Sequence, residues 1–423
     1  MVRDFNSKSS APKKKSTPKK VKTVASVSKV RKVGSRVSRK GNKKKKWGFL
    51  NQLFATNRTA GEMDYTFLLL VGVLVAFGLV MLLSASTPTA NVKFGRSYHF
   101  FLRQLIFVIA GAALMFVCTF IDYRNLKRFV LPIAVTALVL SLLVHVPFIG
   151  VAENGAKRWI KIAGIRLQPS EIMKTAIVLF FAALIDGGKF DVRDIKNGLS
   201  RYVLFMIVAV LPMATQHLSG TIVICGIVLC MLIVAGANVG LIVGGGGIMG
   251  ALLVTAVAFI SPARMARLTS FFNPFTDMQG TGYQTAQSVY AIGSGGIFGK
   301  GLGESVQKFS YLPEPYNDFI FSVTCEELGL IGAMFLIVLF VTLILRGIKI
   351  AMEADDVFGS MIVVGIMAHV AIQTILNIGV ATASIPNTGV SLPFFSYGGT
   401  AILMLLVEMG LVLSVSRYSS KKK

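Results

Sequence analysis

The chain has 423 residues, of which 54% are hydrophobic and only 15% are charged, and its formal net charge is +25 at pH 7. Soluble globular domains are about half apolar and about a quarter charged, so this composition excludes a soluble enzyme. The cysteines lie in or beside apolar runs without metal-ligand spacing, which favours packing roles and excludes a disulfide scaffold or a structural zinc site: Cys118, Cys225, Cys230 and Cys325.

The excess positive charge is concentrated in the first part of the chain. Residues 1–60 contain 19 of the 44 basic residues and a single acid, so most of the excess positive charge lies in this segment. This uneven distribution excludes a purely nucleic-acid-binding protein. Their Lys-, Ser- and Pro-rich composition cannot bury a core and lacks the apolar run of a signal peptide. We expect a basic, disordered cytoplasmic tail. Attraction to anionic lipid needs the fewest assumptions; a cytoplasmic protein partner is an alternative, and nucleic acid is the least expected partner.

Ten apolar runs follow, and each is bounded by charge, Gly, Pro or a polar cluster. They predict an all-α, polytopic membrane domain of ten transmembrane helices within residues 61–418. Residues 202–263 contain no Asp, Glu, Lys or Arg, whereas one crossing needs only about 20 apolar residues, so this stretch accounts for several spans. The predicted spans cover residues 65–86, 98–121, 128–148, 169–186, 202–218, 219–236, 240–261, 318–345, 357–380 and 397–416.

Lys and Arg in short loops set the orientation, because cytoplasmic loops carry an excess of them. The basic tail, three basic loops and a short basic tail at residues 419–423 fall on one side of the ten spans, which places both termini in the cytoplasm. Residues 149–168 and 262–317 are then external. The second is a large extracytoplasmic loop between spans 7 and 8, where we expect the function to lie.

The external segments are rich in glycine and in cations. Gly295 and Gly296 belong to a glycine-dense stretch whose backbone N–H groups could hold phosphate oxygens, or which could be a connector. Cations are unexpected on this side and suggest an anionic ligand such as a phosphate or a carboxylate, with lipid head groups as the alternative. These cations are Lys157, Arg158, Lys161, Arg166, Arg264, Arg267, Lys300 and Lys308.

Acids near the eighth span are further candidates. Asp318 precedes the span directly, where a carboxylate can be a helix N-cap or a catalytic group. Glu326 and Glu327 lie about 12 Å further along the helix, inside the membrane, where carboxylates are functional or form ion pairs within the bundle.

Two positions near the fourth span also have two interpretations. Trp159 stands among cations, where it can be an interfacial belt residue or a platform for a sugar or lipid. Lys174 follows Glu171 by three residues, which indicates a helical ion pair without requiring function.

Several motifs in order resemble the SEDS family of FtsW, RodA and SpoVE, from about residue 62 to residue 416. The sequence at residues 391–395 is more similar to the FtsW and SpoVE branch than to RodA. Asn317 departs from the family's usual Thr, and residues 216–220 lack the acid that the family carries in its fifth span. The motifs are Asp64-Tyr65, Ser84-Ala85-Ser86, GAKRWIKIAGIRLQPSEIMK at 155–174, GTGYQTAQSVYAIGSGGIFGKGL at 280–302, YLPEPYNDFIF at 311–321 and PNTGVSLPFFSYGGT at 386–400.

The resemblance implies a peptidoglycan glycosyltransferase that polymerises lipid II into glycan strands outside the cytoplasmic membrane, for cell division or sporulation. It implies a class B penicillin-binding protein transpeptidase as partner, together with other divisome membrane proteins. The family's essential carboxylate corresponds to Asp318, its functional tryptophan to Trp159, and a charged pair involved in substrate handling to Arg166 and Lys174.

Chemistry adds a hypothesis for the site. Asp318 would be the general base on the acceptor hydroxyl, and the reaction would invert the anomeric centre. Mg²⁺ or Mn²⁺ could share the pyrophosphate, although no ligand cluster in the sequence requires a metal. A lipid II flippase or transporter and a non-catalytic divisome scaffold are the alternative functions. The predicted substrate-binding residues are Trp159, Arg158, Arg166, Lys174, Lys300, Gly295 and Gly296.

Overall fold

The computed structural model describes residues 61–153, 156–162, 165–214, 217–245 and 282–419, with isolated positions at 247, 271, 275 and 280. The predicted tail at residues 1–60, most of the predicted span at 240–261 and the first part of the 262–317 loop lie outside the described residues. The last four residues of the predicted tail at 419–423 do so as well.

The described residues form a predominantly helical domain, so the predicted all-α class is confirmed. Nine of the ten predicted spans coincide with helices in this part of the chain. The helices are α2 (Tyr65–Phe94), α3 (His99–Phe120), η1 (Tyr123–Phe129), α4 (Val130–Leu143), α5 (Pro169–Asp186), η2 (Ile195–Leu199), α6 (Ser200–Ala214), α7 (Leu218–Val234), α10 (Tyr283–Gly295), α11 (Ile320–Glu353), α12 (Val357–Ala381) and α13 (Gly399–Tyr418).

Among the described residues, seven helical stretches are long and apolar enough to cross a bilayer. They comprise α2, α3, η1 with α4, η2 with α6, α11, α12 and α13. Helix α7 is apolar but has only 17 residues, and α5 has 18 residues that include Glu171, Lys174 and Asp186. The topology of ten spans therefore stays a prediction.

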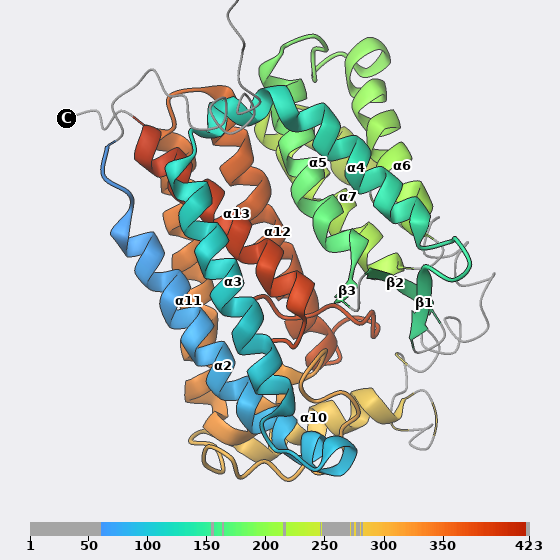
Figure 1. The fold of residues 1–423 in the computed structure, drawn as a ribbon, viewed down its shortest axis with the longest axis vertical. Coiled ribbons are helices and arrows are strands. Elements are labelled where there is room, and N and C mark those ends of the chain that lie inside the picture. The colour runs from blue at the N-terminus through green and yellow to red at the C-terminus, as the bar shows by residue number, and fades with distance from the viewer. Residues whose placement is uncertain are drawn as a thin grey trace, which may run out of the picture. The chain divides into compact units, whose positions relative to one another are not determined.

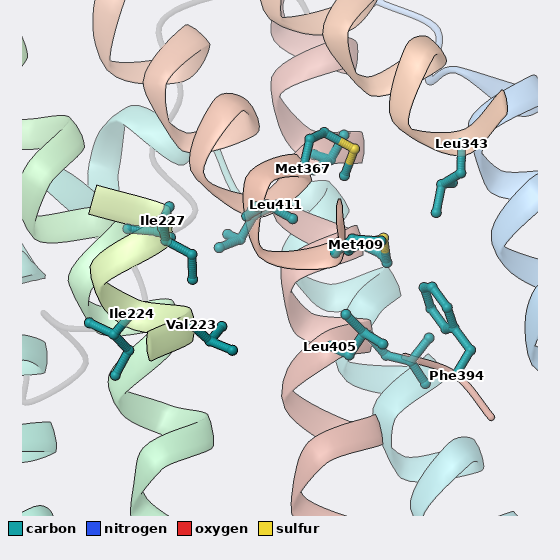
Figure 2. Packing of buried hydrophobic residues seen from close by; sticks show 14 of the residues in the cluster. Val223, Ile224, Ile227, Leu343, Met367, Phe394, Leu405, Met409 and Leu411 are labelled. Atoms are coloured by element: carbon teal, nitrogen blue, oxygen red, sulfur yellow. The ribbon is translucent and has the colours of Figure 1, made fainter. Parts of the chain in front are cut away.

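Helices α12 and α13 form the centre of the bundle. In their most apolar stretches 61% and 67% of the residues are buried, against 17–33% in the other spans. Helix α12 packs against α5, α7, α11 and α13, and α3 packs along α13. Figure 1 shows α2, α3, α11, α12 and α13 side by side, with α4 to α7 as a neighbouring group. Figure 2 shows how side chains such as Ile227, Leu343, Met367 and Met409 fill the core between them.

Small residues allow α3 and α13 to approach closely. A side chain at Gly410 would begin 2.5 Å from the carbonyl oxygen of Met115, and one at Gly111 would begin 2.8 Å from Leu406. Close backbone approach is how membrane helices gain packing energy, because lipid offers them no hydrophobic incentive to associate.

Ion pairs tie the helices together at the end of the bundle opposite α10. Arg346 of α11 holds the Asp64 carboxylate with two nitrogen atoms, Nη2 at 2.7 Å and Nε at 2.9 Å. Asp64 also caps α2 by accepting a hydrogen bond from the Phe67 N–H. Arg124 pairs with Asp356, the N-cap of α12, at 2.6 Å. These contacts fasten α2 to α11 and η1 to the start of α12.

The first predicted external segment is not an irregular loop but a three-stranded antiparallel sheet. It comprises β1 (Gly150–Glu153), β2 (Ala156–Ile162) and β3 (Ile165–Leu167) in the order β1-β2-β3. The segment alternates apolar and charged residues in its second half, as in Ile160, Lys161 and Ile162, which is the pattern of a half-buried strand. Strand β3 leads directly into α5 at Pro169, whose ring suits the first turn of a helix.

Helix α11 is broken near one end. Gly329 has φ 67° and ψ −166°, a conformation that essentially only glycine adopts. The segment after α10 packs into this break. The N–H groups of Lys300 and Gly301 donate to the carbonyls of Glu326 and Glu327, and the Leu330 N–H donates to the carbonyl of Gly296. These hydrogen bonds pair the backbone N–H and carbonyl groups that the break would leave without a partner. Such pairing is required inside a membrane, where no water is available to bond them.

Replacing Gly329 by alanine should destabilise the fold. The backbone conformation alone costs about 1–3 kcal/mol for a residue with a side chain, and the added Cβ would lie 2.3 Å from the Gly299 nitrogen. We expect a lower thermal unfolding midpoint for the purified protein in detergent. Gly72→Ala is the matched control, because a Cβ there meets nothing within 4 Å. Equal midpoints for the two variants would contradict this role of Gly329.

Candidate active site

Asp318 lies at the end of the irregular segment that joins α10 to α11, and it is partly buried. The N-cap of α11 is Phe319, which Asp318 precedes by one residue, so the predicted cap is displaced by one position. The catalytic role of Asp318 stays a prediction.

The backbone that carries Asp318 is held by distant parts of the chain. The carbonyl of Tyr316 accepts a hydrogen bond from the Tyr397 N–H at 2.9 Å. The Asn317 carbonyl accepts one from the Ser396 hydroxyl at 2.5 Å. The Asp318 carbonyl accepts one from Asn377 Nδ2 at 2.8 Å. Consecutive carbonyls are thus fixed by α12 and by the segment between α12 and α13, which leaves the Asp318 backbone little freedom.

The segment between α12 and α13, residues 386–398, lies directly against the Asp318 side chain; we call it the 386–398 segment. Gly389 has φ 68°, and a Cβ at this position would lie 3.2 Å from Asp318 Oδ2. Asn377 Nδ2 also donates to the Val390 carbonyl at 2.7 Å, so one buried amide joins this segment to the Asp318 turn. A glycine is needed here for the backbone angle and for room beside the carboxylate.

The membrane carboxylates next to this site form ion pairs, which was one of the two sequence-based interpretations. Glu326 has no exposed surface and accepts a hydrogen bond from Lys300 Nζ at 2.6 Å. Hydroxyl and backbone N–H groups of the same loop also donate to it. These further donors come from Ser294, Ser305, Val306 and Gln307.

Glu327 is paired in the same manner. Lys308 Nζ lies 2.7 Å from Glu327 Oε1, and both side chains are almost fully buried. Ser84 of α2 donates to the same carboxylate at 2.6 Å and accepts from Lys308 at 3.0 Å. The motif at residues 84–86 therefore joins α2 to the loop and to α11. Lys300 and Lys308 have carboxylate partners, so their presence in the predicted external loop requires neither an anionic ligand nor lipid head groups.

Gly295 and Gly296 have packing roles in the structure. A Cβ on Gly295 would lie 2.0 Å from the Cys325 carbonyl oxygen, so this glycine lets α10 contact α11. Gly296 has φ 56° and ψ −147°, which ends α10 and turns the chain toward the break in α11. Both are needed for the loop to reach Glu326, whether or not they contact a substrate.

The sheet separates the predicted substrate-binding residues. Arg158 shares a face of β2 with the fully buried Ile160, so it points toward the helices. Trp159 lies on the opposite face, and the pairing of Lys161 with Arg166 places Arg166 on that same face. Arg158 and Trp159 therefore cannot act on one part of a substrate.

Lys174 is buried within the bundle. Its Nζ lies 2.7 Å from the Glu171 carboxylate and 3.0 Å from Gln373 Oε1. The predicted i,i+3 pair is present, and a polar contact to α12 is added to it. Arg158 and Lys174 are both close enough to His217 to act on it electrostatically, which brings the inner face of the sheet near Lys174.

Within the described ranges, no group of three or more His, Cys, Asp or Glu side chains is placed to hold a metal ion. A divalent ion that accompanies the pyrophosphate of a substrate stays a hypothesis.

Sequence reasoning missed Gly389 and the polar residues of α12. His369, Gln373 and Asn377 recur every four residues, which places them on one face of a helix within an otherwise apolar span. That spacing was a usable signal, because polar groups inside a membrane are costly and therefore informative.

The comparisons with known proteins agree with the fold and with the motifs. The family of FtsW, RodA and SpoVE, described as "Cell cycle protein", matches residues 64–421. Stage V sporulation protein E of Bacillus subtilis is 40% identical over 84% of this chain and 97% of its own length. A probable peptidoglycan glycosyltransferase FtsW of Geobacter metallireducens is 39% identical over 84% of this chain and 94% of its own.

Solved structures with the same fold include two that cover 84% of this chain and 98% of their own. One comes from work titled "Structural coordination of polymerization and crosslinking by a peptidoglycan synthase complex", with a TM-score of 0.70 and 27% identity. The other is the rod shape determining protein RodA of Thermus thermophilus, with a TM-score of 0.62 and 26% identity.

Removing one partner of the deeper ion pair should destabilise the protein strongly. Lys308→Met leaves the Glu327 carboxylate buried without its cation, and such a loss costs about 3–5 kcal/mol. Lys300→Met is the matched comparison, because 32% of the Lys300 side chain is exposed and other donors remain on Glu326. We expect thermal unfolding in detergent to show the larger loss for Lys308→Met. A larger loss for Lys300→Met would refute this ranking.

Proposed function

We infer that the chain, which belongs to the FtsW, RodA and SpoVE family of cell cycle proteins, is a peptidoglycan glycosyltransferase that polymerises lipid II. It is a multi-pass membrane protein. Family membership, together with relatives of nearly equal length that carry this activity in their names, supports the reaction. The observation that carries the mechanism is the Asp318 carboxylate, held at the start of α11 against Gly389.

The proposed reaction is a direct displacement. The 4-hydroxyl oxygen of the acceptor GlcNAc attacks the anomeric carbon of the donor sugar, and the bond from that carbon to the pyrophosphate breaks. Asp318 accepts the hydroxyl proton, and undecaprenyl pyrophosphate leaves with the bonding electrons. A single displacement inverts the anomeric centre. A base whose backbone is fixed supports this scheme, because rates depend on holding the reacting groups in line.

The predicted substrate-binding residues divide into two groups in this proposal. Arg166 would contact the pyrophosphate directly, and Trp159, on the same face of the sheet, would pack against a sugar or the lipid. Arg158, on the opposite face, would add positive potential from the inner side of the sheet. Lys174 and Lys300 would add positive potential while remaining paired with Glu171 and Glu326. The turn at Gly295 and Gly296 would shape the loop around the leaving group.

The active site would face the outside of the cell, with both termini in the cytoplasm. Helix α11 has Asp318 before its first residue and Arg346 in its last turns, about 40 Å away along a helix. Arg124, Lys127 and Arg346 form ion pairs at that second end. An excess of cations marks the cytoplasmic side, which supports an external Asp318.

The expected partner is a class B penicillin-binding protein transpeptidase, with other divisome membrane proteins around it. A related solved structure is described as a peptidoglycan synthase complex that coordinates polymerization and crosslinking.

The second candidate function is a lipid II flippase, because transporters use polar groups inside the membrane. The polar cluster inside the bundle that favours it comprises Lys174, Glu171, His369 and Glu408.

Asp318→Asn should abolish glycan polymerisation. The amide keeps the size of the side chain but cannot accept the hydroxyl proton, and loss of a general base lowers the rate by about 100- to 10,000-fold. The measurement is polymer formed from lipid II by the purified protein with its transpeptidase partner present. Wild type and variant are compared at equal thermal stability. Equal polymer from both would remove Asp318 from the chemistry, and transport of lipid II across vesicles without polymer would favour the flippase.

Gly389→Ala should lower the rate without removing any chemical group. The new Cβ would begin 3.2 Å from Asp318 Oδ2 at a backbone angle that disfavours alanine, so the carboxylate must move. A misplacement of about 1 Å can cost about 100-fold in rate, and we expect a lower kcat with a smaller effect on KM. Gly293→Ala is the control, since a Cβ there meets nothing within 4 Å. An unchanged kcat for Gly389→Ala would show that this segment does not position the base.

A further inference from the structure

A chain of buried polar side chains runs from α13 through α12 to the 386–398 segment. Glu408 of α13 lies 2.7 Å from His369 Nδ1, and the other ring nitrogen, Nε2, lies 2.7 Å from Gln373 Oε1. Gln373 Nε2 donates to the carbonyl and to the hydroxyl of Ser391, each at 2.9 Å. Gln373 is thus the junction between the intramembrane groups and the segment that contacts Asp318.

The partners of Gln373 determine which way its amide points. Lys174 Nζ is only a donor and lies 3.0 Å away, so the amide atom that faces it must be the oxygen. The carbonyl of Ser391 is only an acceptor, so the atom that faces it must be the amide nitrogen. One orientation satisfies both contacts, and the side chain is 5% exposed, so these protein groups are its main partners.

This orientation also determines where protons lie on the neighbouring pair. Because Gln373 Oε1 only accepts, His369 Nε2 must carry a hydrogen. His369 Nδ1 and Glu408 Oε2 then share one further proton, held on either atom, so that the pair has no net charge. Thr175 donates to the remaining carboxylate oxygen of Glu408 at 2.7 Å. With Lys174 neutralised by Glu171, the buried cluster is electrically neutral, which makes its burial tolerable.

The cluster borders a small cavity beside the 386–398 segment. This cavity of about 20 Å³, enough for one water molecule, is lined by Glu171, His369 and Gln373 on one side and by Ser391 and its neighbours on the other. The segment is therefore not held by close packing alone at this point. Hydrogen bonds from α12 hold the segment in place where it is not closely packed.

We propose that Gln373, oriented by His369 and Glu408, is a positioning residue for the reaction. It fixes Ser391, and through the 386–398 segment it keeps Gly389 against the Asp318 carboxylate. Asn377 extends the same face of α12 and holds the Asp318 turn directly. In this scheme Glu408 is needed as a hydrogen-bond partner and not as a group that changes charge. The inference rests on the proposed function, in which Asp318 is the base.

The experiment measures kcat and KM for lipid II polymerisation by the full-length protein with its transpeptidase partner. Gln373→Glu keeps an acceptor for Lys174 and His369 but loses the donor to Ser391. We expect its kcat to fall by about 10- to 100-fold while KM changes by less than about twofold. Thr374→Val is the matched control and should behave as wild type, because Thr374 is the next residue of α12, is 6% exposed, and its hydroxyl has no hydrogen-bond partner.

A second pair of variants tests how Glu408 acts. In Glu408→Gln the amide can donate to His369 Nδ1 and accept from Thr175, so the orientation of Gln373 is preserved, and we expect more than half of the wild-type kcat. Glu408→Ala should lose kcat as Gln373→Glu does. Loss of kcat in Glu408→Gln would overturn the positioning role and assign Glu408 a function that depends on its charge.

The outcomes separate this inference from the proposed function. If wild type forms no polymer, or if Asp318→Asn polymerises as wild type does, the proposed function fails. If wild type is active and Asp318→Asn is not, but Gln373→Glu keeps the wild-type kcat or changes only KM, the positioning inference fails alone. Should Gln373→Glu not fold, Gln373→Met, which is neutral and of similar size, is measured with the same expectation and the same contradicting result.

Discussion

The structure depends on the neutralisation of charge inside the membrane. A charge in the bilayer interior is tolerated only when it is paired and hydrogen-bonded. In the described helices the buried glutamates meet this condition, each with a cation or a histidine at 2.6–2.7 Å. Three of the four contacts join elements that are otherwise separate: two join the loop before α11 to α11, and one joins α13 to α12, whereas Glu171–Lys174 lies within α5. The ion pairs therefore determine how the helices are placed around Asp318. The pairs are Glu171–Lys174, Glu326–Lys300, Glu327–Lys308 and Glu408–His369.

The break in α11 follows from the same requirement. Glu326 and Glu327 can receive lysines from the loop only if that loop comes close to the helix backbone, and Gly295, Gly299 and Gly329 leave room for it. The backbone groups freed by the break are taken up by the loop in turn. The short first part of α11 is thereby held as a rigid unit, and Asp318 stands at its start. A base on a fixed helix end is better placed for catalysis than one on a free loop.

Sequence alone predicted the helical class and most of the helices, but not the sheet, the break in α11 or the contacts. The apolar runs predicted nine helices that the structure contains in its described part, because bilayer thickness imposes a length that hydropathy reveals. The resemblance located Asp318. The partners of Lys300 and Lys308 could not be predicted. The sequence around a cation next to a span does not reveal whether the cation pairs with a carboxylate of the protein or binds a ligand. Gly389 was missed because its role depends on the neighbouring carboxylate, which is 71 residues away in the chain, at residue 318.

The pairing of the intramembrane charges also bears on the choice between polymerase and flippase. A pyrophosphate that crosses the bilayer needs cations along its path. In the described part of the bundle, Lys174, Lys300 and Lys308 are already neutralised by carboxylates, and separating such a buried pair costs about 3–5 kcal/mol. A flippase would bear this cost at each step, whereas a polymerase needs no such step, because its pyrophosphate stays at the outer surface. Arg166 is exposed on the face of the sheet opposite to Ile160, so a pyrophosphate could reach it without entering the bundle. The electrostatics of the described bundle therefore favour chemistry at one face of the membrane over transport through it.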